Sequence, residues 1–260
     1  MPGGPFVIFI GFVVLVAVIG IVRARHRRQR ALELQRFAAS NGWTYLAEDD
    51  RQCSRWQRPP FNEGFDRRAK NVLFGRHRNH EMLAFDYTFK TRTQDPNGSS
   101  TQTHYYRVCA IALPTYLPLL EVSAENVLTR VAHVVGLQDI QFESEDFNRR
   151  YRVHGANPKF AYDVLSPRTI QSLMNLPVYQ WRIDGASIVS WATGSNNPVD
   201  LLGRLTALAT VVDGVPQFVW HDHGVATAPP VAPAPPITAP PAPQSAALAP
   251  PTGSSAGPKP

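Results

Sequence analysis

Cysteine is scarce in this chain, which has only Cys53 and Cys109 among its 260 residues. Two thiols cannot build a disulfide framework, and neither lies in a C-x-x-C pair or another metal-binding spacing. Cys109 falls in an alternating apolar run, where a reduced, buried thiol is expected. A bridge between the two cysteines would require the domain to lie outside the cytosol.

Catalytic and nucleotide-binding motifs are also missing. The sequence has no G-x-S-x-G, H-E-x-x-H or G-x-G-x-x-G pattern. The loop "WATGSNNPVD", Trp191 to Asp200, has one glycine and no following lysine, so it is not a phosphate-binding loop. We therefore expect no cofactor, and we favour a binding protein over an enzyme.

Charge is modest in amount and uneven in position. Charged residues make up 18% of the chain and the formal net charge is +6. Most of the excess comes from the stretch "VRARHRRQR". Its arginines are Arg23, Arg25, Arg27, Arg28 and Arg30. No aromatic residues interleave with them, which argues against nucleic acid. We interpret them as a topology signal that also contacts anionic phospholipid headgroups.

Pro5 to Val22 form an 18-residue run without a charged side chain. A helix of about 20 apolar residues spans the hydrocarbon core of a bilayer, so this run predicts a single transmembrane helix. The arginines follow the run and do not precede it, and no small-residue cleavage site separates them, which argues against a cleaved signal peptide. Positive flanks stay on the cytoplasmic side. We therefore expect a cell-membrane protein with its N-terminus outside and its domain in the cytoplasm.

The remaining chain suggests one domain and a tail. We divide it as 1–4, a short N-terminal segment; 5–22, the transmembrane helix; 23–30, the basic juxtamembrane segment; 31–224, a cytosolic domain; and 225–260, a tail. In the tail, 12 of 36 residues are proline and most others are small. Such a composition cannot bury a core, so we expect disorder.

Residues 31–224 predict an α+β fold, an antiparallel sheet covered by helices on one face. The order of elements also resembles a pleckstrin-homology barrel capped by its last helix. Alternation predicts strands over 82–91 and 104–113, and hairpins over 140–153 and around Asp184-Gly185. Polar residues followed by proline predict three helix starts, at Asn157, Ser166 and Asn197.

An acidic run offers the clearest candidate chemistry. Glu143, Glu145 and Asp146, here called the acidic set, lie close in sequence to His154. Paired carboxylates beside an imidazole can perform general acid–base catalysis, so the alternative function is a membrane-tethered hydrolase using these four residues. A solvated hairpin face is the plainer interpretation of the same run.

His221 and His223 are a second, weaker candidate. On a strand, imidazoles two residues apart would share a face and could provide two metal ligands. The sequence offers no third ligand, so ordinary surface histidines are the plainer interpretation and we expect no metal.

Several segments, "FAASNGWTY", "LAFDYTF" and above all "ESEDFNRRYRV", resemble a family of uncharacterised actinobacterial single-pass membrane-anchored proteins. The resemblance covers about residues 5–222. It implies an anchor followed by a domain, and it implies no catalytic residue. The function expected from the sequence is a membrane-anchored binding or scaffold protein that contacts a protein partner or an anionic lipid surface.

Overall fold

The protein was examined as a computed structural model, which describes residues 4–95, 98–124 and 137–224 and, within the first helix, the side chains of 17–22 and 24–40. The predicted tail, 225–260, lies outside the described residues. The elements at the N-terminal end are α1 (Gly4–Ser40), β1 (Thr44–Glu48), η1 (Asp50–Ser54), β2 (Phe65–His77), β3 (His80–Asp95) and β4 (Gly98–Ala124). These are followed by β5 (Gln138–Asp139), α2 (Glu145–Arg150), β6 (Tyr151–Gly155), α3 (Pro158–Val164), α4 (Pro167–Met174), β7 (Trp181–Thr193), α5 (Pro198–Gly214) and α6 (Gln217–Gly224).

One seven-stranded antiparallel sheet organises the domain, so the predicted α+β class with an antiparallel sheet is confirmed. The strand order is β1-β2-β3-β4-β6-β5, and β7 pairs with β4. Among the described residues this path is open, with β1 and β5 at its ends, so the suggested closed barrel is not formed. The 27-residue strand β4 pairs with β3 in its first half, with β6 in its second, and with β7 across both.

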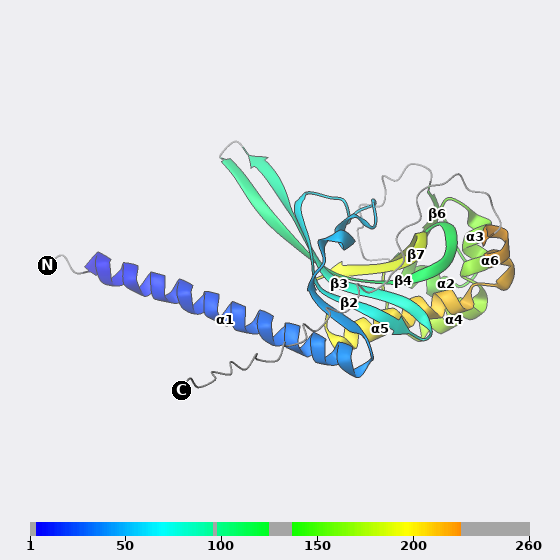
Figure 1. The fold of residues 1–260 in the computed structure, drawn as a ribbon. Helices are drawn as coiled ribbons and strands as arrows, with labels where there is room; N and C mark the ends of the chain where they lie inside the picture. The colour runs from blue at the N-terminus through cyan, green and yellow to red at the C-terminus, as the bar shows by residue number, and fades with distance from the viewer. Residues whose placement is uncertain (1–3, 96–97, 125–136, 225–260) are drawn as a thin grey trace, which may run out of the picture.

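Both faces of the sheet are covered, although helices on one face only were expected. Helices α3 to α6 and the end of α1 pack over one face, as Figure 1 shows. Residues 49–64, here called the wrapping segment, cover the other face with Trp56 and Phe61. These rings pack against Phe85 and Tyr87 of β3, with Trp56 and Phe61 ring centroids 4.8 Å apart. Each face of the sheet therefore has its own apolar core.

The predicted transmembrane helix is wrong. In the parts of the chain that the structure describes, no helix is both long and apolar enough to cross a membrane. Residues 5–22 belong to α1, a 37-residue helix that runs on through the basic segment and ends inside the domain.

Local sequence signals explain the helix ends. The side chains of Asn157, Ser166 and Asn197 each accept a hydrogen bond from a backbone N–H of the first helical turn, which confirms all three predicted starts. Helix α1 ends at Ser40 and is followed by Gly42, whose φ of 68° is unfavourable for other residues. The next amide, that of Trp43, donates to the carbonyl of Ala38 at 2.8 Å.

Two predicted hairpins differ in the structure. The first is formed only at its ends, where β5 pairs with β6 and the Ile140 amide donates to the Val153 carbonyl at 2.9 Å. Between these ends Ser144 caps α2 by accepting from the Phe147 amide, so the predicted turn is a helix. In place of the second, β7 runs straight through Asp184, and Gly185, with φ 67°, lies opposite Leu117 at a register shift of β4. A glycine of positive φ marks a bulge here rather than a turn.

Candidate functional site

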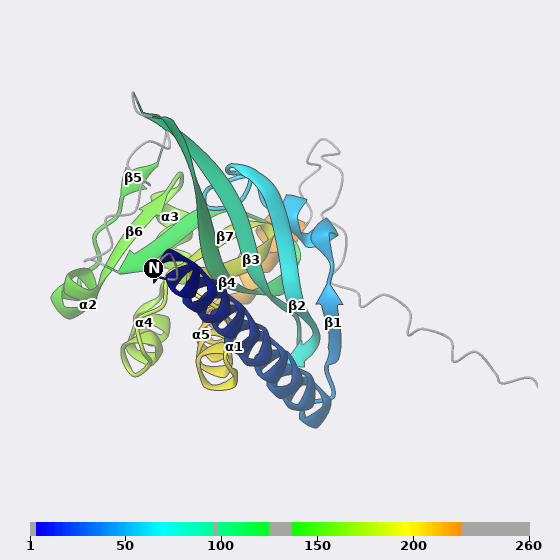
Figure 2. The same ribbon diagram turned by 90° about the vertical axis from the view of Figure 1, so that its left-hand side faces the viewer.

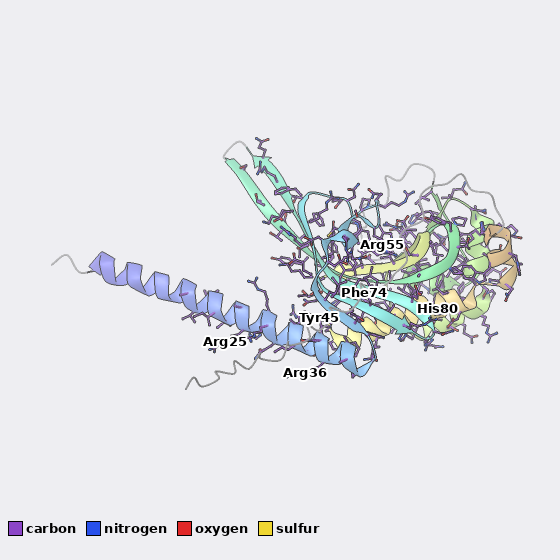
Figure 3. The ribbon with its side chains drawn as sticks, in the orientation of Figure 1. Arg25, Arg36, Tyr45, Arg55, Phe74 and His80 are labelled. Atoms are coloured by element: carbon purple, nitrogen blue, oxygen red, sulfur yellow. The ribbon has the colours of Figure 1, made fainter. Side chains whose placement is uncertain are left out.

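The basic segment, residues 23–30, lies on a part of α1 that leaves the domain. Figures 1 and 2 show α1 projecting on the same side as the β3–β4 hairpin, and Figure 3 shows Arg25 on the projecting part. The described arginines, Arg25, Arg27, Arg28 and Arg30, are all exposed. Apolar side chains directly before them are exposed too, Ile21 by 55%. The projecting helix therefore presents apolar and then cationic surface to its surroundings.

The other end of α1 is held firmly. Leu34 and Ala38 are buried at 0% and 1% exposure, as their spacing predicts. Phe37 meets the Trp43 ring edge-on at a centroid distance of 5.4 Å, and the Trp43 indole donates to the carbonyl of Arg76 at 2.9 Å. A helix fixed at one end carries the arginines in a defined direction relative to the domain.

The acidic set does not lie on a hairpin. Glu143 precedes α2 while Glu145 and Asp146 occupy its first turn, and all three are exposed. Asp146 accepts a hydrogen bond from Arg149 at 2.7 Å on the same helix. In the described ranges no group of three or more His, Cys, Asp or Glu side chains could hold a metal ion, so the acidic set and His154 do not form a metal centre. Their catalytic use stays a prediction.

His154 instead belongs to a row of ionisable residues across four strands. It lies opposite Glu121 of β4 and Asp139 of β5, and Glu121 lies opposite Arg182 of β7. Residues directly opposite in antiparallel strands share a face of the sheet. The row therefore runs from an exposed edge at Asp139 to the interior at Arg182.

Glu121 and Arg182 are buried ions at the inner end of this row. Their side chains are 4% and 2% exposed, and the guanidinium Nη1 lies 3.5 Å from the Glu121 Oε2. The same Nη1 donates to the carbonyl of Pro59 at 3.0 Å, and the group lies 4.8 Å from the ring centroid of Trp191. Burial raises the pKa of Glu121, an effect that Arg182 opposes. The pair thus joins two strands to the wrapping segment. Its role is structural, because neither charged group is exposed to a substrate.

Sequence reasoning missed this pair. The sequence does contain a sign of it, because a single charged residue stands in each of two apolar stretches, Glu121 in "LPLLEV" and Arg182 in "YQWRI". Charges are almost never fully buried unless they are paired. Two such residues in one sheet therefore indicate partners, although their register cannot be read before the strand pairing is known.

The two candidate metal histidines lie on a helix, α6, and not on a strand. Residues two apart on a helix point to different sides. His221 is exposed. The His223 ring lies edge-on to the Phe160 ring at a centroid distance of 5.7 Å, and the backbone carbonyl of His223 accepts a hydrogen bond from the Thr115 hydroxyl at 3.0 Å. The arrangement does not point both imidazoles at one ion.

Both cysteines are buried free thiols, as predicted for Cys109. Burial raises the pKa of each thiol to about 12. A thiol with so high a pKa carries almost no thiolate at neutral pH, so neither is activated as a nucleophile.

Asp86 is the other buried carboxylate of the sheet. It is 8% exposed and accepts hydrogen bonds from the Asn196 amide at 2.7 Å and from the Asn71 side chain at 2.8 Å. The Tyr45 hydroxyl donates to Asn71 at 2.8 Å. The network ties β1, β2 and β3 to the residues that lead into α5. Burial raises the pKa of Asp86, against the lowering effect of these hydrogen bonds.

This shift predicts how stability depends on pH. A carboxyl whose folded pKa lies above its ordinary value, 3.8 for Asp86, stabilises most below that value, and the contribution is lost as the pH rises through the folded pKa. We expect the free energy of unfolding of the wild type, minus that of Asp86→Asn, to fall as the pH rises from about 4 towards neutrality. Urea unfolding across this range measures it, with the exposed Asp222→Asn as control. A difference that grows with pH would contradict the argument.

The sequence matches no family model, and a search of curated proteins finds no match. One solved structure is similar, the crystal structure of the mycobacterial trehalose monomycolate transport factor A, TtfA. The TM-score is 0.56 at 15% sequence identity, and the match covers 72% of this chain and 94% of that chain. At this identity the likeness shows a shared fold.

Proposed function

We propose that this chain is a binding or scaffold protein that works against an anionic lipid surface and holds a partner protein there. The observation that carries the proposal is the run of exposed arginines on a helix that projects from the domain and is fixed at its other end. A flexible tail could also carry charge, but only a fixed helix sets the orientation of the domain on the surface.

Electrostatics favours lipid as the contact. Each arginine near an anionic bilayer surface contributes about 1 kcal/mol, and the guanidinium fork matches phosphate oxygens. The exposed apolar residues Ile19, Ile21 and Val22 adjoin the arginines, and such side chains can enter the headgroup region of a bilayer. The cytoplasmic leaflet is the anionic one in cells, so we place the contact at the cytoplasmic face of the cell membrane.

The structural neighbour supports a more specific role. Its name describes a transport factor for trehalose monomycolate, and the shared fold spans almost all of that chain. We propose that this chain is likewise an accessory factor for lipid transport, with the domain as the part that contacts other proteins. In the described residues we find no set of catalytic side chains that point toward one another, so the proposal includes no chemical step.

Vesicle binding tests the proposal. The full chain is mixed with vesicles of phosphatidylcholine alone or with about 30% phosphatidylglycerol, and the bound fraction is measured by sedimentation. We expect binding to the anionic vesicles at about 0.1 M salt and its loss near 1 M, because the Debye length falls from about 10 Å to about 3 Å. Equal binding to both vesicle types, or binding that resists salt, would contradict an electrostatic contact.

A further inference from the structure

A cavity of about 400 Å³, largely open to solvent, lies where β3 and β4 part. The two strands stop pairing at Met82 and Ile111, while β4 continues beyond the β2–β3 turn. The ends of α5 and α6 close the space from the helical side with Val212 and Trp220. Figure 3 places His80, one of the lining residues, far from Arg25, so this cavity is separate from the lipid contact. Its volume lies within the range of small-molecule sites.

The lining combines an apolar base with a polar rim. Leu113 and Val212 are buried at 8% and 6% exposure, and the half-buried Trp220 adds an aromatic ring. The rim carries the guanidinium of Arg76 and, directly opposite on the next strand, the carboxylate of Glu81. Arg76 is positioned by its hydrogen bonds to Asn79, at 2.7 Å to the carbonyl and 3.2 Å to the side chain.

The charges of the rim cancel. Arg76 faces Glu81 across the strand pair, and His80 is held by Asp213 at 2.7 Å. A site without net charge does not favour a phosphate or a carboxylate. A purely apolar ligand does not fit either, since it would strip water from the rim groups without offering hydrogen bonds in return.

The class of ligand that fits both the rim and the base is a ring that bears hydroxyl groups. Arg76 only donates hydrogen bonds, Glu81 only accepts them and the Asn79 amide does both, while a hydroxyl group can meet either need. The flat apolar face of a sugar ring can pack on the indole of Trp220 and on the aliphatic base. We propose that this cavity is a binding site for a neutral pyranose sugar, free or as the headgroup of a larger molecule.

Binding of methyl α-glucopyranoside to the full chain tests this site without vesicles, so its result is independent of the lipid contact. Saturation-transfer NMR and a fluorescence titration are expected to give a dissociation constant of about 1 mM, the affinity that about 13 non-hydrogen atoms reach at ordinary ligand efficiency. Glu81→Gln and Arg76→Gln should each weaken binding by about tenfold, since each removes a hydrogen bond to a charged group.

Trp220→Leu should abolish the saturation transfer to the C–H protons of the ring, while the exposed Arg168→Gln should bind as the wild type does. Far-UV circular dichroism confirms that each variant is folded. Three results would overturn the proposal: no binding at tens of millimolar sugar, binding that none of the cavity variants changes, or displacement of the sugar by an equal concentration of inorganic phosphate.

Discussion

Replacing Arg25, Arg27, Arg28 and Arg30 together by glutamine is expected to weaken binding to anionic vesicles by several hundredfold or more. Four arginines at about 1 kcal/mol each contribute about 4 kcal/mol, and every 1.4 kcal/mol is tenfold in affinity. The four side chains are exposed and lie outside both apolar cores, so the domain should unfold at the same urea concentration as the wild type. Vesicle sedimentation over a lipid titration measures the affinity.

The matched control removes the same charge elsewhere. Lys70, Arg149, Lys159 and Arg168 are exposed on the domain and can be changed to glutamine together. If the helix orients the domain on the surface, this control should lose far less than the α1 variant. Equal losses would show that net charge and not position governs binding, and an unchanged affinity in the α1 variant would refute the lipid contact.

The elements that could be predicted are those with a local cause. The alternation of Leu83, Phe85, Tyr87 and Phe89 places all four in one core, as expected. The proline-containing helix starts were found because a capping side chain and the helix that it opens are adjacent in sequence. The end of α1, just before Gly42, has the same local origin.

The failures share a different cause, which is pairing with distant strands. Asp184-Gly185 has the composition of a tight turn, but β4 supplies a partner on both sides of it, and β7 continues as one strand with a bulge at Gly185. Proline is unfavourable inside a strand, yet β4 continues past Pro114 and Pro118, because both fall where its register against β7 is shifted. Asp86 stands between the apolar residues Phe85 and Tyr87 in an alternating strand, where the pattern predicts exposure, but it is buried and hydrogen-bonded to Asn196, 110 residues away.

The features of the candidate site also differ in whether they follow from local sequence or from contacts between distant residues. Exposure of the basic segment follows from composition alone, whereas the pairing of Glu121 with Arg182 depends on two strands 61 residues apart. The proposed sugar-binding cavity is more distant still from sequence reasoning, since its wall combines the β2–β3 turn, three strands and two helices. Such a site exists only after the sheet and helices have packed.

Arg182→Met is expected to lower the free energy of unfolding by about 3–5 kcal/mol, the usual cost of leaving one partner of a buried ion pair alone. The carboxyl groups of Glu121 and Asp184 would both lose the guanidinium, and the Glu121 Oε1 has no hydrogen-bond partner among the described residues even in the wild type. The carbonyls of Arg58 and Pro59 would also lose a donor, which loosens the wrapping segment over the second core. Urea unfolding followed by tryptophan fluorescence measures the loss, and Arg168→Met, at an exposed position, should change it by less than about 0.5 kcal/mol.

A second variant and a pH series separate charge from packing. Glu121→Leu combined with Arg182→Met removes both ions, so it should be more stable than Arg182→Met alone. Because burial already raises the pKa of Glu121, loss of Arg182 should raise that pKa further, and the stability deficit of Arg182→Met should shrink as the pH falls and Glu121 is protonated. Two results would together contradict this argument: a stability deficit that is independent of pH, and a double variant less stable than the single one. Arg182 would then act through its aliphatic and cation–π packing on Trp191 rather than by neutralising Glu121.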